Sequence, residues 1–561
     1  MTGARADRRA TLERLGAETF DLLVIGGGVT GAGIARDAAL RGLKVALVEK
    51  TDFAAGTSSK SSKLVHGGFR YLEHAQFRLV FEGTNERALL MKVAPHLVRP
   101  LEFLLPVYKH DKPGLFVLDV GLWIYDGLSK FSSPKLHRTV RAPRLGKIEP
   151  GLKRDGLDGG LLYYDCATDD ARLTLENIVD ARALGASIAN YTRAVKLIRD
   201  GDRIAGAEVQ PVDPGDGGDG RDGGATIAVR AKVTINATGP WTDDVRRLAG
   251  DKSILHASKG VHLVVDAKRL APRHAVVMKQ KKRIVFCIPW GQDRTVIGTT
   301  DTFWDAPPEE VHTDAADVAY LLDLANNYFP EAKLTPDDVL ATWAGVRPLI
   351  KPDSDVATAS DVSREHHILE RPGLVTIAGG KLTTYRRMAA EVVDHAGKQL
   401  GELPPCGTET RPLPGAAEPI YSAGYAGVTA LQERLAGEGV VDAAVAKHLA
   451  NTYGARAPSV VARVKAEAAL GERLDPELAY VMAQVDVAVD EEQALTVEDV
   501  LGRRLQLLLR ARDQGLGCTE RVARRMATRL DWDEARTTRE IAHYRGVVAG
   551  TRQFRGGGPR V

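Results

Sequence analysis

A glycine-rich motif in the stretch VIGGGVTGAG constrains the fold more than any other feature of this sequence. Gly26, Gly28 and Gly31 supply the spacing G-x-G-x-x-G, directly after the apolar run FDLLVIG. A helix-like segment follows, and a second apolar run, KVALVEK, carries Glu49 near its end. In a βαβ unit such glycines let the backbone approach a pyrophosphate, the helix N-terminus supplies amide donors, and the acidic residue accepts from a ribose hydroxyl. The motif therefore predicts a Rossmann-like, dinucleotide-binding α/β domain.

The segment after Glu49 favours FAD over NAD as the dinucleotide. An NAD-binding sheet would continue with further βα units, whereas this chain continues with TDFAAGTSSKSSKLVHGG, a polar run rich in small residues. Its Thr57, Ser58, Ser61 and Lys63 are predicted to line the pyrophosphate and the edge of the flavin ring.

In two later stretches a predicted strand ends in small residues. This pattern is typical of flavoproteins in which the chain comes back to the cofactor after a long intervening segment. The first is INATGPW, with Ala237 and Gly239, and the second is IAGGKLTTYR, with Gly380, Leu382 and Thr383. A helix N-terminus at the second could direct amides at the flavin and stabilise the charge of the reduced ring. Three separate stretches that converge on one ligand predict FAD as the cofactor.

The composition is that of a globular protein with nearly balanced charge. The 561 residues are 44% hydrophobic and 27% charged, and the formal net charge is +3, which argues against a nucleic-acid partner. The four cysteines are far apart, so neither a metal cluster nor a disulfide framework is predicted. No N-terminal apolar segment suggests a signal peptide, and no run approaches the ~18–20 apolar residues that span a bilayer.

The order of apolar and helical segments predicts several domains. We expect a Rossmann-like FAD-binding domain, an inserted antiparallel-sheet domain for the substrate, and an all-α C-terminal domain in which Thr496 and Asp499 begin a helix with a capping box. The predicted division is a basic tail at 1–19, the FAD-binding domain at 20–255 and 371–400, the substrate domain at 256–370, the helical domain at 411–548 and a second basic tail at 549–561.

Two features leave alternatives open. The arginine-rich ends read as solvated disordered tails or as segments that attract anionic lipid headgroups. The stretch GLFVLDVGLWIYDGL, residues 114–128, is followed by basic residues, so it fits either a helix lying in a membrane surface or a core helix with a polar exit.

Several longer motifs resemble those of one family, the FAD-dependent glycerol-3-phosphate dehydrogenases of bacteria and mitochondria. The similar stretches occur in family order over roughly residues 20–390, and the C-terminal region also fits. They are IGGGVTGAGIARDAALRGL, TSSKSSKLVHGGFRYLE, YYDCATDDARL, NATGPW, RIVFCIPW, IGTTDT, WAGVRPL and GGKLTTYRRMA.

The resemblance implies oxidation of sn-glycerol 3-phosphate to dihydroxyacetone phosphate. It implies hydride transfer from C2 to flavin N5 and passage of the electrons to a membrane quinone. A cytoplasmic protein held peripherally on the inner face of the cell membrane, with an affinity for anionic lipid, would follow. A homodimer is a further expectation.

The resemblance also implies a substrate-binding set, namely Arg70, Tyr71, Arg347, Arg364 and Lys381. Guanidinium forks suit a phosphate dianion, and Lys381 could stabilise the anionic reduced flavin. Arg364 is followed by Glu365, where the family usually has aspartate.

His66 is expected either to be the general base or only to hydrogen-bond the backbone or flavin. Together with Arg347 and Lys381 it makes up the predicted catalytic set.

Other functions remain open at this point. An oxidase would hand electrons to oxygen and release hydrogen peroxide. An amine or amino-acid oxidase of the same superfamily would need a clamp for a carboxylate. The predicted basic residues Arg70, Arg347 and Lys381 disfavour a non-catalytic flavoprotein scaffold. The Ala-Thr-Gly stretch that ends a predicted strand disfavours an NAD-linked dehydrogenase.

Overall fold

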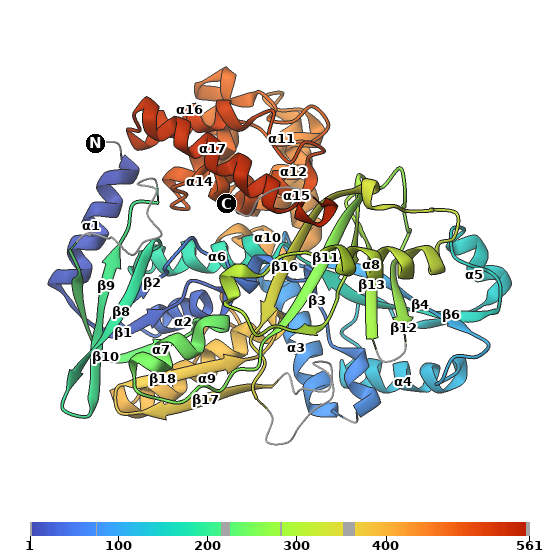
Figure 1. Ribbon diagram of the computed structural model, residues 1–561, viewed down its shortest axis with the longest axis horizontal. Helices are drawn as coiled ribbons and strands as arrows, with labels where there is room; N and C mark the ends of the chain where they lie inside the picture. The colour runs from blue at the N-terminus through green and yellow to red at the C-terminus, as the bar shows by residue number, and fades with distance from the viewer. Residues whose placement is uncertain (1–2, 75, 215–224, 281–282, 352–364, 557–561) are drawn as a thin grey trace.

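The chain forms two large sheets with a helical C-terminal region across one side of both (Figure 1). The computed structural model describes residues 3–74, 76–214, 225–280, 283–351 and 365–556. The two sheets and the helical region confirm the predicted fold class.

The first sheet has a parallel centre in the order β18-β10-β1-β2-β7, with β17 antiparallel at one edge. Parallel strands covered on both faces are apolar along their whole length, as VALV of β2 is. The bounds are β1 Thr19–Ile25, β2 Val45–Val48, β7 Ser187–Ala189, β8 Thr192–Asp200, β9 Arg203–Pro211, β10 Ile227–Asn236, β17 His366–Arg371 and β18 Leu374–Gly379.

Three helices cover one face of this sheet, and a mixed layer covers the other. The helices are α2 (Val29–Leu40), α6 (Asp170–Ala183) and α9 (Tyr385–Leu400). The second face packs against α1 (Gly3–Ala17), the β8–β9 pair and α7 (Thr242–Leu248). The carboxyl ends of β1, β2, β10 and β18 are thereby left as the edge where a ligand can bind.

The second sheet is larger than the predicted inserted domain. Its order is β15-β11-β14-β13-β12-β4-β6-β3, with β16 beside β11 and β5 beside β6. The bounds are β3 Leu64–Val65, β4 Arg99–Tyr108, β5 Arg138–Arg141, β6 Leu157–Ala167, β11 Ser258–Asp266, β12 Ala275–Gln280, β13 Arg283–Trp290, β14 Arg294–Gly298, β15 Thr302–Phe303 and β16 Val339–Arg347.

The predicted division at residue 256 therefore differs from the division into sheets. Strands β3 to β6 fall within the predicted FAD-binding range of 20–255, yet they pair in the second sheet. The joining pair is β4 with β12, two segments far apart in sequence, and no local pattern reports such a pairing. Helix α8 (Ala315–Tyr328) interrupts the strands of this region.

Helices α3 (Phe77–Val93), α4 (Leu115–Leu128) and α5 (Ala142–Ile148) accompany β4 to β6. Helix α4 buries Leu115, Leu118 and Leu122 against the second sheet. Its other side is exposed and apolar. Within the described ranges, none of the helices has the length and apolar composition needed to cross a bilayer.

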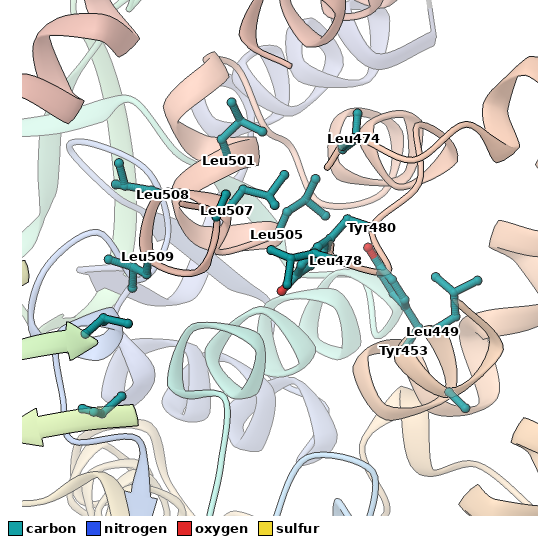
Figure 2. Close-up of a cluster of buried hydrophobic side chains, with 14 of the residues drawn as sticks. Leu449, Tyr453, Leu474, Leu478, Tyr480, Leu501, Leu505, Leu507, Leu508 and Leu509 are labelled. Carbon is teal, nitrogen blue, oxygen red and sulfur yellow. The ribbon is translucent and has the colours of Figure 1, made fainter. Parts of the chain in front are cut away.

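The C-terminal region is helical, as predicted, and its leucine-rich core, part of which Figure 2 shows, is continuous with buried residues of the second sheet such as Val264 and Trp343. The predicted cap is confirmed: Asp499 N donates to Thr496 Oγ1 at 3.1 Å and Thr496 N donates to Asp499 Oδ2 at 3.0 Å. The bounds are α10 Ile420–Ala423, α11 Tyr425–Gly437, α12 Ala443–Tyr453, α13 Ala457–Ala466, α14 Ala483–Asp490, the π-helix η11 Asp499–Arg504, α15 Leu507–Arg510, α16 Thr519–Leu530 and α17 Glu534–Gly550.

Both predicted tails need correction. Residues 3–17 form helix α1, in which Leu15 is completely buried and Arg8 donates to Asn190. Tertiary contacts therefore order a segment whose sequence looks evenly polar. At the other end Phe554 is buried and Arg555 donates to the Val339 carbonyl at 2.6 Å. Residues 557–561 lie outside the described residues.

Candidate functional site

A cavity of about 830 Å³ lies at the carboxyl ends of the first sheet's parallel strands. The turn after β1, the segment after β2 and the turns after β10 and β18 all contribute to its lining. The three stretches expected to converge on one ligand therefore meet at one cavity. Of the predicted cofactor residues, the lining contains Gly26, Gly28, Glu49, Thr57, Ser58, Ser61, Ala237, Gly239, Gly380 and Leu382.

The glycine-rich turn has the form that a pyrophosphate requires. Gly28 caps α2 without a side-chain hydrogen bond, so the helix opens directly onto the cavity. Val29 N donates to Ser58 Oγ at 2.9 Å, which holds the second stretch against the turn. Glu49 accepts from Gly27 N at 2.7 Å and from Thr51 N at 2.9 Å, and its carboxylate retains lone pairs for a ribose hydroxyl.

Three predicted cofactor residues have other positions. Gly31 is not part of either cavity lining described here; a Cβ there would stand 1.9 Å from the Gly26 carbonyl oxygen, so it permits the turn to pack on its helix. Lys63 Nζ turns to Asp170 Oδ1 at 2.6 Å. Thr383 lines the second cavity, where its hydroxyl accepts from His66 N at 3.1 Å and donates to the His66 carbonyl at 3.3 Å.

A second cavity, of about 270 Å³, adjoins the first between the two sheets. Thr57, Pro348, Gly380 and Lys381 line both cavities. The second cavity is therefore where a molecule would meet the ligand of the first.

Arg347, at the end of β16, projects into this second cavity in a fixed orientation. Its Nη1 donates to Asp301 Oδ1 at 3.2 Å and to Ser258 Oγ at 3.4 Å, and its Nη2 donates to Thr299 Oγ1 at 3.1 Å and to the Thr300 carbonyl at 3.2 Å. The side chain is 20% exposed. A guanidinium whose terminal nitrogens are held in this way keeps its plane and its charge in a fixed orientation in the cavity wall.

Lys381 and Tyr71 lie together in the same lining. The Lys381 ammonium stands 3.8 Å from the centre of the Tyr71 ring, a cation–π contact that orients it. His66 also lines this cavity, next to the Thr383 contact. The structure thus brings Tyr71, His66, Arg347 and Lys381 to one place.

The remaining two predicted residues are described in part or not at all. Arg70 lies in the short helix η2 (Phe69–His74), but its side chain is outside what the structure describes. Arg364 lies outside the described residues altogether.

His262 of β11 also lines the second cavity, and sequence reasoning did not single it out. Its Nε2 is 2.8 Å from Ser62 Oγ, and its ring stacks on Trp343 with centroids 4.8 Å apart. Gly298 faces it across the sheet; a Cβ there would stand 2.1 Å from the imidazole, so only glycine leaves room. Burial, followed by the charges of Arg347 and Lys63, lowers the pKa of His262 well below the usual 6.5. The imidazole is therefore neutral at neutral pH, and it is a weaker base than a free imidazole.

Two family models match the chain. One, described as FAD dependent oxidoreductase, matches residues 21–386, and the other, described as the C-terminal domain of alpha-glycerophosphate oxidase, matches residues 406–537. The first spans nearly all of both sheets and of both cavity linings. FAD is thus the cofactor of this chain, in agreement with the glycine-rich turn and the helix end that open onto the larger cavity.

Relatives of known family align over nearly the whole chain. Glycerol-3-phosphate dehydrogenase 2 of Mycobacterium tuberculosis is 39% identical over 97% of this chain and 90% of its own length. The aerobic glycerol-3-phosphate dehydrogenase of Bacillus subtilis is 36% identical over 94% of each chain. Among solved structures, the glycerol-3-phosphate dehydrogenase of Bacillus halodurans complexed with FAD matches with a TM-score of 0.80 and 33% identity over 100% of both chains. The chain therefore belongs to the family of FAD-dependent glycerol-3-phosphate dehydrogenases.

Proposed function

We propose that this protein oxidises sn-glycerol 3-phosphate to dihydroxyacetone phosphate and passes the electrons to a membrane quinone. The observation that carries the proposal is the second cavity, which adjoins the FAD cavity and has a lining that favours an anion. Its cationic side chains outnumber its carboxylates, Asp165 and Asp301. Burial lowers the pKa of Lys60, and the cationic side chains remain in the majority when Lys60 is left out of the comparison. The cationic residues are Lys60, Lys279, Arg283, Arg347 and Lys381.

A phosphate dianion suits this lining better than an amino acid does. The Arg347 fork and the Lys381 ammonium supply donors of fixed position, and each charge-assisted hydrogen bond contributes roughly 1.5–3 kcal/mol. Arg70 and Arg364 are proposed to add to this set. An amino-acid substrate would need an acceptor for its ammonium group as well. Both carboxylates of the lining are already engaged, Asp301 by Arg347 and Ser258, and Asp165 by Arg87 and Tyr125.

Proton removal from the C2 hydroxyl is assigned to an imidazole of the second cavity. The two candidates are His66 and His262, which both line this cavity; His262 is neutral, and its Nε2 lies within hydrogen-bond distance of Ser62 Oγ. FAD, when bound, supplies N5 as the acceptor for the C2 hydride. The residues proposed to hold it are those of the larger lining, from Gly26 and Glu49 through Ser58 to Gly380.

The exposed side of α4 supports the membrane part of the proposal. Phe116 is 79% exposed and Trp123 is 53% exposed, and Val117, Val120 and Ile124 share that side. The exposed residues Lys130, Lys135, Arg138, Arg141 and Arg144 follow the helix. Apolar side chains beside cationic ones are typical of a helix lying in an anionic lipid surface. We infer peripheral binding to the inner face of the cell membrane.

The same helix is adjacent to the second cavity. Phe69 lines that cavity and meets Tyr125 of α4 edge-on, with ring centroids 5.8 Å apart. A lipid-soluble acceptor could thus reach the flavin from the membrane side. A homodimer stays a prediction, and light scattering on the purified protein tests it.

The testing experiment compares electron acceptors and substrates in steady state. The purified holoenzyme is supplied with glycerol 3-phosphate and either a quinone analogue or oxygen alone, with hydrogen peroxide measured in parallel. The proposal predicts rapid quinone reduction and little peroxide. Stoichiometric peroxide would instead assign the oxidase reaction, and turnover of glycine or sarcosine in place of glycerol 3-phosphate would overturn the substrate.

A further inference from the structure

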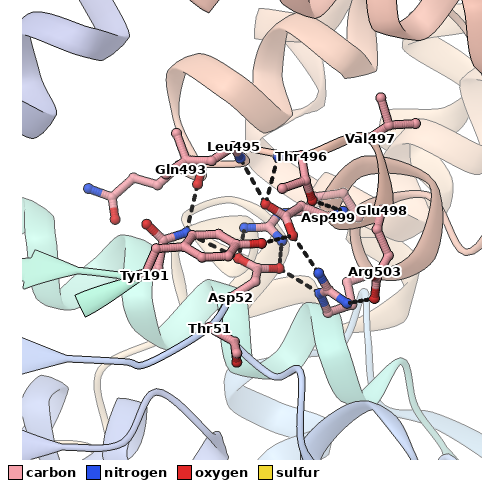
Figure 3. Close-up of polar contacts among 12 residues, drawn as sticks. Thr51, Asp52, Tyr191, Gln493, Leu495, Thr496, Val497, Glu498, Asp499 and Arg503 are labelled. Carbon is pink, nitrogen blue, oxygen red and sulfur yellow. Dashed lines mark hydrogen bonds and ion pairs between the residues drawn. The ribbon is translucent and has the colours of Figure 1, made fainter. Parts of the chain in front are cut away.

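The helical C-terminal region holds the walls of the FAD cavity without lining it. Among the described residues, both cavity linings end before residue 390. Yet residues 492–506 of the helical region make buried polar contacts to the segments that form the larger cavity (Figure 3). These contacts raise the question of what they do for the cofactor.

The first contact is a buried ion cluster centred on Asp52. Its side chain is 1% exposed; Oδ2 accepts from Arg503 Nε at 2.6 Å and from Arg504 Nη1, and Oδ1 accepts from Arg504 Nη2 at 2.8 Å. Asp52 lies three residues after Glu49, and its neighbours Thr51 and Ala55 line the FAD cavity. The wall that carries Glu49 is therefore joined to η11 by charge.

The second contact joins the neighbouring segment, residues 190–195, at the same end of the cavity. Tyr191 Oη donates to Asp499 Oδ1 at 2.7 Å, and Asn190 Nδ2 donates to the Gln493 carbonyl at 2.9 Å. Thr192 begins the part of this segment that lines the cavity, and its N donates to the Glu49 carbonyl at 2.7 Å. Both walls at the Glu49 end thus depend on the same helical segment.

The middle of the cavity is held in a related way. Ser61 lines the cavity, and its hydroxyl donates to Asp170 Oδ2 at 2.7 Å. The neighbouring Asp169 accepts from Gln506 Nε2 at 2.7 Å, and Arg172, one turn along α6, pairs with Glu492. The N-terminus of α6 therefore contacts both Ser61 and the helical region, and it links the position of one to that of the other.

In the docked structure, Arg503 and Arg504 stabilise the Asp52 carboxylate as an anion. Burial by itself would raise the pKa of Asp52, but the charges of Arg504 and Arg503 more than offset this and lower it. Without the two guanidinium groups, a carboxylate at this depth would have to take up a proton or move toward water. Movement of residues 50–57 would displace Glu49 and Thr57 together.

We propose that Asp52, Arg503 and Arg504 are positioning residues for FAD, so that docking of the helical region and retention of the cofactor stabilise each other. Coupling between two binding events is reciprocal, so FAD also tightens the docking. The proposal depends on FAD as cofactor and not on the identity of the oxidised substrate.

The test measures FAD affinity in Asp52→Asn, which keeps the size of the side chain and removes its charge. The deflavinated protein is titrated with FAD, and flavin fluorescence gives the Kd. We expect the Kd to rise about tenfold, a size typical of coupling between sites. The matched control is Arg525→Gln, which breaks pairs with Asp486 and Glu467 inside the helical region and leaves both walls untouched.

A second measurement keeps the proposal falsifiable if Asp52→Asn fails to fold. Hydrogen exchange of residues 495–510 is followed in the wild-type protein with and without FAD. Slower exchange with FAD supports reciprocal coupling. An unchanged exchange rate, a wild-type Kd in Asp52→Asn, or an equal rise of the Kd in Arg525→Gln would each overturn the proposal.

Discussion

At the scale of single residues, Arg347 shows why geometry matters beyond charge. Five acceptors, on β11 and in the turn between β14 and β15, hold its two terminal nitrogens. Lysine at this position would keep the charge but lose the planar fork.

We expect Arg347→Lys to lower kcat/KM for glycerol 3-phosphate by roughly 10- to 100-fold, since at least one charge-assisted bond to the phosphate is lost. Arg347→Ala should lower it further. Steady-state kinetics measures both. Arg269→Lys is the matched control, because Arg269 makes a similar fork to Asp338 at the surface. A wild-type kcat/KM in Arg347→Lys would exclude Arg347 from phosphate binding.

Kinetics should show which of the two histidines of the second cavity, His66 or His262, is the general base. If His262 takes the proton, His262→Asn should lower kcat by about 10²–10⁴-fold, the usual contribution of general base catalysis. Because its pKa lies well below 6.5, the wild-type kcat should not fall as pH drops through 6.5. The pH dependence is measured as kcat at saturating substrate, because the substrate's phosphate group itself titrates near pH 6 and would change substrate binding. A larger loss in His66→Asn than in His262→Asn would transfer the role to His66.

The sequence predicted some of these residues and not others for a physical reason. Tyr71, His66, Arg347 and Lys381 belong to distinctive short motifs, and the structure places all four on one cavity. His262 lies inside an apolar strand, where a lone histidine reads as core. Its surroundings follow only from the pairing of β11 with β14 and β16, which brings Gly298 and Trp343 to it across long stretches of sequence.

At the scale of elements, helix α4 gives the sharpest test of membrane binding. Burial of one large apolar side chain contributes about 1.5–3 kcal/mol, so Phe116→Asp with Trp123→Asp should greatly weaken binding to anionic vesicles. Co-sedimentation with the vesicles measures this. Tyr425→Ser removes a 41% exposed ring from α11 and serves as control. Equal sedimentation of the double variant and the wild-type protein would place the membrane contact elsewhere.

Local patterns predicted the elements that local forces form. The β1–α2–β2 unit and the Thr496 cap agree with the sequence because apolar periodicity, glycine and capping residues act over a few positions. The transfer of β3 to β6 into the second sheet and the docking of α1 were missed, since both are decided by partners distant in the chain.

At the scale of the whole molecule, a buried histidine links stability to pH. His96 is 0% exposed, and burial, with Arg172, Arg99 and Arg456, lowers its pKa to about 3. The unfolded chain has a pKa near 6.5 there and takes up a proton first, so stability falls as pH drops below 6.5. From pH 8 to pH 5 this one group should remove roughly 2 kcal/mol.

We therefore expect His96→Met to unfold with a weaker pH dependence than the wild-type protein between pH 8 and pH 5. Denaturant titrations at several pH values measure the free energy of unfolding. His110→Gln, at an exposed position, is the control. A difference between wild type and His96→Met that stays constant over this pH range would contradict the assignment.

Across the molecule, the central claim is that the two adjoining cavities bring glycerol 3-phosphate to FAD. The most direct measurement is anaerobic mixing of the purified holoenzyme with glycerol 3-phosphate, with no acceptor present. The account predicts rapid bleaching of the flavin's visible absorbance and one dihydroxyacetone phosphate formed per flavin reduced. A flavin that stays oxidised with glycerol 3-phosphate, yet is bleached by dithionite, would contradict it.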